Sequence, residues 1–128
     1  MLFDSKLLFA TDQACAAAED AVVVFGTHLD LGGTGLGIGE PFRVGAVVTT
    51  AFTDTADATA VLSVTTCATT GGTYVALASA NAINVDYLIK GKEITLTVGP
   101  GCLQFVKLSV TAVGAALAVG KMIAGIVK

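Results

Sequence analysis

The chain has 128 residues, of which 54% are hydrophobic and only 13% are charged, and its formal net charge is −3. One domain accounts for this length, and an acidic chain whose only arginine is Arg43 offers no basic stripe for nucleic acid. A membrane-spanning helix is excluded as well, because glycines and Lys121 interrupt the most apolar stretch, residues 110–127, and spanning takes about 20 continuous apolar residues.

The first 20 residues are expected to form an N-terminal arm or edge strand, ahead of a β-sandwich over residues 21–128. Residues 1–3 and 7–9 are too apolar for a solvated tail. This segment either completes the core as an edge strand or lies on a partner subunit as an arm. The candidate contacts with a partner are Leu2, Phe3, Leu7, Leu8 and Phe9.

The N-terminus carries no recognisable export signal. Its apolar run at residues 7–10 is much shorter than the core of a secretory signal, which has about 7 to 15 apolar residues. We therefore expect synthesis in the cytoplasm. The alanine-rich run at residues 14–18 is too short for a helix on its own, so an extended segment or a short turn is predicted there.

The rest of the chain has the pattern of short strands. Val, Thr, Ile and Phe recur in runs separated by Gly, Asn, Asp and Pro, which is typical of β-structure. Alternation of apolar and polar residues indicates strands with one buried face. The predicted strands are residues 21–25, 42–52, 59–66, 73–77, 85–89, 93–98, 103–113 and 121–127.

Turn residues separate these runs. The glycine pair in Thr70-Gly71-Gly72-Thr73 predicts a hairpin between the third and fourth strands, because glycine supplies the positive φ angles of tight turns. Pro100 ends the strand over 93–98, since proline lacks an N–H. About eight strands without an amphipathic helix predict an all-β fold, a jelly-roll-like sandwich of two antiparallel sheets.

The glycine-rich segment over residues 32–39 does not fit a nucleotide-binding loop. In the dinucleotide fingerprint the third glycine follows the second by three residues, and here Ile38 or Glu40 stands at that place. No Gly-Lys-Ser/Thr sequence occurs either. We expect a surface loop and no nucleotide cofactor.

Metal binding is not predicted. His28 and Asp30 would share one face of a strand, but His28 is the only histidine and a pair lacks the three or four ligands of a metal site. Cys15, Cys67 and Cys102 have no Cys-x-x-Cys spacing and lie among small apolar residues. They are expected to be reduced, buried side chains.

Catalysis is not expected. No serine lies in a nucleophile elbow, and Asp54 and Asp57 occupy a turn-like segment in which carboxylates are usually solvated. The remaining enzymatic alternative is a small hydrolase that uses Asp54 or Asp57. Trp is absent and only Tyr74 and Tyr87 are present, which disfavours a platform for stacking sugars or bases.

Three segments in order resemble the capsid cement proteins of Bordetella-phage-type tailed phages: Leu-Phe-Ala-Thr-Asp-Gln-Ala at 8–14, Asp-Leu-Gly at 30–32 and Gly-Ile-Gly-Glu-Pro-Phe at 37–42. The likeness extends loosely over nearly the whole chain, and the order of the segments with the chain length carries it. The glycine run is longer than the family pattern. The resemblance implies a jelly roll that self-associates outside an icosahedral shell and has no catalytic residues.

The expected function is therefore that of a virion structural protein that stabilises a phage head by bridging neighbouring major capsid subunits. Its partners would be the major capsid protein, which the N-terminal residues could contact, and further copies of itself in a dimer or trimer. We expect it on the outer capsid surface, with neither nucleic acid nor membrane as a partner. The alternative is a ligand- or glycan-binding jelly-roll module of a phage tail or fibre.

Overall fold

The computed structural model describes residues 3–26, 28–31, 41–54 and 57–127. Within these ranges nearly all regular structure is β, and the prediction of an all-β sandwich is confirmed. A short 3-10 helix, η2 (Val85–Tyr87), accompanies the strands β1 (Phe3–Ala14), β2 (Val22–Val24), β3 (Leu29–Asp30), β4 (Phe42–Asp54), β5 (Thr59–Cys67), β6 (Val75–Ser79), β7 (Ile83–Asn84), β8 (Glu93–Val98), β9 (Phe105–Val113) and β10 (Leu117–Val127).

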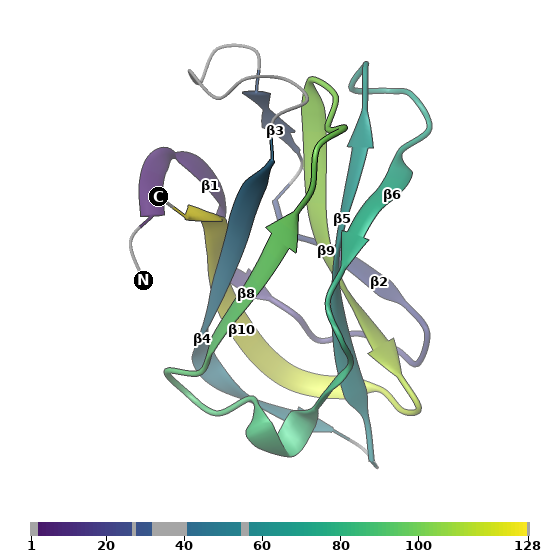
Figure 1. Ribbon diagram of the computed structural model, residues 1–128. Coiled ribbons are helices and arrows are strands. Elements are labelled where there is room, and N and C mark those ends of the chain that lie inside the picture. Colours follow the sequence, from purple (N-terminus) through teal and green to yellow (C-terminus); the bar gives the residue numbers. More distant parts are fainter. Residues whose placement is uncertain (1–2, 27, 32–40, 55–56, 128) are drawn as a thin grey trace.

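The strands form two antiparallel sheets that face each other (Figure 1). The first sheet has the order β1-β10-β4-β8 and the second the order β2-β9-β5-β6. β3 follows β2 along β9, and β7 lies beyond β6 along β5. Each of these two pairs therefore occupies one strand position, which makes eight positions in the described chain.

The pairing is nested. β1 pairs with β10, β2 and β3 pair with β9, β4 pairs with β8, and β5 pairs with β6. The chain thus forms one long antiparallel ribbon that is folded over itself. Pairing of β10 with β4 and of β5 with β9 joins the folded ribbon into two sheets. This arrangement is an eight-stranded jelly roll.

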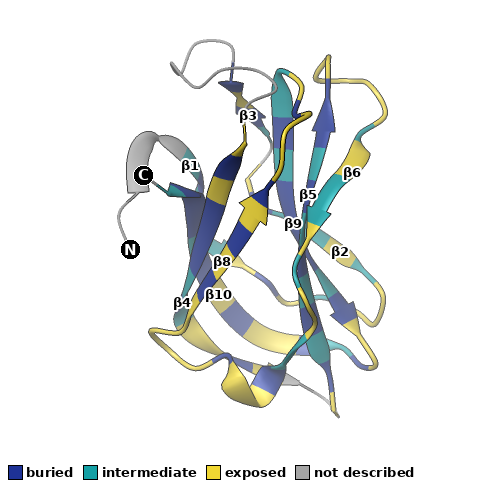
Figure 2. Cartoon of the chain, viewed as in Figure 1, coloured by how far each residue is buried: buried dark blue, intermediate teal, exposed yellow. Residues whose placement is uncertain are grey.

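The core lies between the sheets and follows the predicted alternation. In β8, Ile94, Leu96 and Val98 are buried and the residues between them are exposed (Figure 2). The inward residues of β9 are buried from Val106 to Ala112. Full burial of a Val or Leu side chain contributes roughly 1.5–3 kcal/mol, so this alternation supplies the main stabilisation of the fold.

One strand position is interrupted at Gly26. The chain leaves β9 after β2 and returns at β3, and Gly26 has a φ of +63° in between. Its N–H donates a 3.0 Å hydrogen bond to Oε1 of Gln13. A Cβ at Gly26 would collide with the carbonyl oxygen of Phe9, so this crossing needs glycine.

The predicted strand over residues 85–89 is wrong. Residues 85–87 form η2, in which the side chain of Asn84 accepts a hydrogen bond of 2.9 Å from the N–H of Asp86. Val85 and Leu88 are buried, whereas Tyr87 and Ile89 are exposed. The three-residue spacing of buried side chains is that of a 3-10 turn, and the Asn84 cap outweighs the β propensity of the sequence.

Three other strands begin two or more residues away from the predicted start. β6 begins at Val75 and β9 at Phe105, each two residues later than predicted. β10 begins at Leu117, four residues before the predicted start. The early part of β10 pairs with β4 through register shifts around Val119 and Lys121, and such bulges interrupt the two-residue period that sequence patterns rely on.

Gly120 gives a direct test of packing at this irregular part of β10. It has a φ of +156°, and a Cβ there would lie 2.6 Å from ring atoms of the buried Phe52. Gly120→Ala is expected to lower the free energy of unfolding by about 1–3 kcal/mol, measured by urea denaturation. Gly71→Ala, at a site with no atom within 4 Å, serves as the control and should change stability by less than about 0.5 kcal/mol. Equal losses in the two variants would contradict the packing argument.

Candidate interaction surface

The two aspartates considered for catalysis lie at the end of β4 and just before β5. Asp54 is the last residue of β4, and Asp57 is exposed just before β5. In the described part of the chain no group of three or more His, Cys, Asp or Glu residues could hold a metal ion. The glycine-rich segment over 32–39 lies outside the described residues.

His28 and Asp30 have separate partners. The His28 ring meets the Phe105 ring edge-on, with 5.2 Å between centroids and an interplanar angle of 86°. A carboxylate oxygen of Asp30 accepts a hydrogen bond of 3.1 Å from Nε2 of Gln104. Both residues thus fasten the β3 end of the sandwich to β9 and its preceding loop.

The N-terminal segment is an edge strand in this structure. β1 pairs with β10 through several register shifts. Of the five candidate partner contacts, Leu2 lies outside the described residues, and only the backbone of Phe3 and Leu7 is described. Leu8 is half-buried, and Phe9 belongs to the core with 7% of its side chain exposed. Phe9 therefore stabilises the sandwich itself.

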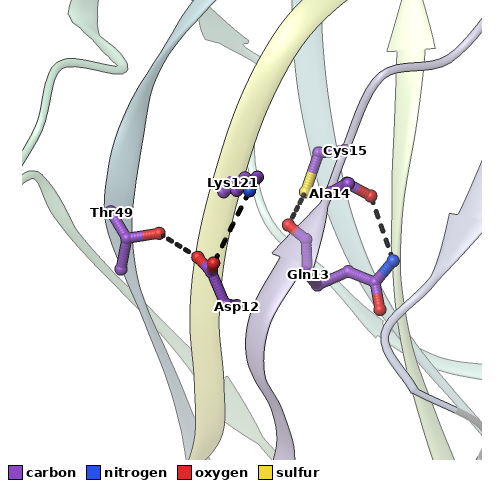
Figure 3. A network of polar contacts seen from close by, with 6 residues as sticks. All are labelled: Asp12, Gln13, Ala14, Cys15, Thr49 and Lys121. Atoms are coloured by element: carbon purple, nitrogen blue, oxygen red, sulfur yellow. Dashed lines mark hydrogen bonds and ion pairs between the residues drawn. The ribbon is translucent and has the colours of Figure 1, made fainter.

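A polar network fixes the far end of β1 against the sheet (Figure 3). One carboxylate oxygen of Asp12 accepts a 2.8 Å hydrogen bond from Oγ1 of Thr49, and the other lies 3.7 Å from Nζ of Lys121. The network spans β1, β10 and β4. An exposed ion pair of this kind contributes about 0–1 kcal/mol, so the network ties β1 to β10 and β4 and adds little to overall stability.

The outer face of the second sheet has an uncharged patch that spans three adjacent strands. We call this patch the neutral face; it takes outward residues from β2, β5 and β9 and stops before Lys107, the next outward residue of β9. In the ladders Val22 and Val61 both lie opposite Thr111, Val24 and Ser63 both lie opposite Ser109, and Thr59 lies opposite Val113. The neutral face therefore consists of Val22, Val24, Thr59, Val61, Ser63, Ser109, Thr111 and Val113.

The polar groups of the neutral face are partly satisfied within it. The hydroxyls of Ser63 and Ser109 are 3.0 Å apart and share a hydrogen bond. Val22 and Val113 are 58% and 40% exposed, Ser109 is buried, and the other five members are half-buried. A surface of valine side chains, threonine methyls and paired hydroxyls loses little when water is removed. Its chemistry suits association by burial.

Charged residues stand at the two ends of the neutral face. Lys107 continues the outward row of β9, and its Nζ lies 4.1 Å from the centroid of the Tyr74 ring. At the other end Asp20 donates its N–H to the carbonyl oxygen of Ala112, and the backbone of Asp57 approaches Gly114. Both aspartates are exposed.

The outer face of the first sheet is different. Arg43 and Glu93 point outward from β4 and β8, and Asp12 and Lys121 are exposed beside them. Charges therefore cover one outer face of the sandwich and border the other. Sequence reasoning did not single out the neutral face. Its only signal was the choice of Val, Thr and Ser at the outward positions of β5 and β9, where charged residues commonly occur.

The sequence matches no protein-family model, and comparison with curated proteins finds no relative. Among the described residues no helix has the length and apolar character to cross a membrane.

The three cysteines form no disulfide with one another and are buried, as predicted. Cys15 is fully buried, and its Sγ donates a 3.3 Å hydrogen bond to the carbonyl oxygen of Gln13. Burial raises the pKa of the Cys15 thiol from its ordinary value of 9.0 to about 12. The thiol at the end of β1 is therefore a packing group in its neutral form.

This pKa gives a pH-dependent stability. Between pH 9 and about 12 the folded thiol keeps its proton while the unfolded thiol loses it, so the unfolded state binds fewer protons and stability falls as pH rises. The decline is at most roughly 1.4 kcal/mol per pH unit. Urea unfolding of the wild type and Cys15→Ala should show the stability difference shrinking above pH 9. A constant difference would show that Cys15 does not ionise on unfolding in this range.

Proposed function

We propose that this protein is a non-enzymatic structural protein of a virus particle, a cement protein on the outside of an icosahedral phage capsid. It bridges neighbouring major capsid subunits and reaches the capsid after synthesis in the host cytoplasm. The observation that carries the proposal is the neutral face, an uncharged surface of valine, threonine and serine on a rigid two-sheet scaffold. Such a surface is suited to docking.

The fold supports this role because the outer faces of its sheets are open. The nested pairing leaves the outer faces of both sheets without any strand or helix packed on them among the described elements. A decorating protein gains strength from many modest contacts repeated over a symmetric shell. Each copy then needs only a small, preformed surface, because the shell supplies the multiplicity.

A second candidate function is a glycan-binding module of a phage tail or fibre. The specific observation in its favour is Tyr87, whose side chain is 68% exposed at the end of η2, next to the exposed Ile89. An exposed aromatic ring can stack on a sugar. Lys107 covers the ring of Tyr74, the other tyrosine, so Tyr87 would have to act without it.

Co-sedimentation with capsids tests the leading proposal. Purified protein mixed with expanded capsids of the matching major capsid protein should pellet with them, saturate at a fixed ratio of copies per capsid subunit, and raise the temperature at which the capsids break open. Protein spun alone is the control and stays in the supernatant. Protein that remains in the supernatant with capsids, and binds instead to glycans in a Tyr87-dependent manner, would support the second candidate.

A further inference from the structure

We propose that the neutral face is a self-association surface, on which two copies of this chain pack face to face around a twofold axis that lies in the plane of the contact and runs across β9. The inference deepens the proposed function, on which it rests for its biological setting, by naming the surface and the partner. It concerns the free protein and can therefore be tested without capsids.

The first argument is the absence of like charges across the contact. In a twofold interface the same patch meets itself, so a charged patch would repel its own copy. The eight residues of the neutral face are uncharged, whereas the outer face of the other sheet carries Arg43 and Glu93. Among the two outer faces of the described sandwich, the neutral face is the one that can meet itself without burying charged side chains.

The second argument is the order of the charges at its ends. Along β9 the outward row runs from Lys107 through Ser109 and Thr111 to Val113, a length of roughly 20 Å at the rise of a β-strand. The backbone of Asp20 lies beside Ala112 and that of Asp57 beside Gly114, at the Val113 end of this row. A twofold axis near Ser109 and Thr111 reverses this order in the second copy, which brings Lys107 of each copy toward the aspartates of the other.

The third argument is that Lys107 is already positioned. Its ammonium group lies over the Tyr74 ring, and Thr65 lies beside it in the ladder. A side chain held in this way loses less conformational freedom on binding than a free lysine does. Complementary charges at the rim then set the orientation of the two copies, and burial of the valines supplies the affinity.

The test is sedimentation velocity of the full chain over a range of concentrations. Wild-type protein should form dimers, and Thr111→Lys should weaken dimerisation by more than roughly tenfold because it places two like charges near the axis. Thr95→Lys is the matched control, since Thr95 is an exposed outward residue of β8 on the other sheet. Urea unfolding of each variant checks that it is folded.

Charge reversal tests the orientation. Lys107→Glu should weaken the dimer, and Lys107→Glu combined with Asp57→Lys should restore at least part of the loss. Thr111→Cys should be cross-linked to a second copy by a short bismaleimide, whereas Thr95→Cys should not, because the native cysteines are buried. A wild type that stays monomeric at every concentration, a Thr111→Lys dimer as strong as wild type, or no restoration by the reversed pair would each overturn the inference.

The two proposals fail in different ways. A monomeric protein that still pellets with capsids would refute the self-association surface and leave the cement function standing. A protein that dimerises through the neutral face and does not pellet with capsids would refute the cement function alone.

Discussion

The constraint on which this molecule depends is that the apolar inner faces of two antiparallel sheets can leave water only against each other. Each sheet is half of one core: β4, β8 and β10 supply one wall, and β5 and β9 supply the other. The nested pairing lets a single chain build both walls, because each strand of the first half of the chain pairs with a strand of the second half. Stability, strand register and the character of the outer faces all follow from this arrangement.

Irregular positions occur where the ribbon bends around that core. Gly26 interrupts the strand beside β9, and Gly120 lies under the Phe52 ring where β10 meets the end of β4. A Cβ at Gly26 would collide with the backbone of β1 in the other sheet, and a Cβ at Gly120 would collide with a ring on the neighbouring strand of its own sheet, so the sequence has glycine at both places. The Asp12 network then holds the end of β1 on the first sheet, and the buried Cys15 follows it.

The functional proposals concern what remains after the core is formed. A sandwich buries its inner residues whatever its function, so the choice of outward residues is free to serve binding. Here one outer face bears ordinary surface charges, and the other presents valine, threonine and serine with charges only at its ends. The contrast within one small domain supports docking through the neutral face.

The sequence by itself determined the class of the fold. Alternation at residues 93–98 and 59–66 was sufficient to predict which side chains are buried, because a strand with one face in water shows a two-residue period. It predicted that the three cysteines are buried, and it predicted the hairpin that joins β5 to β6. It did not predict η2, where a local hydrogen bond from the Asn84 side chain decides the backbone, or the bulged start of β10, where the period is broken.

Only the tertiary structure decided which strands are neighbours, and with them the neutral face. Val22, Val61 and Thr111 are far apart along the chain, and no pattern in one segment shows that they share a surface. Their adjacency comes from pairing between strands distant in sequence, which is set by burial of the whole core. Local sequence fixes which way a side chain points from its own strand, and the packing of two sheets fixes what lies next to it.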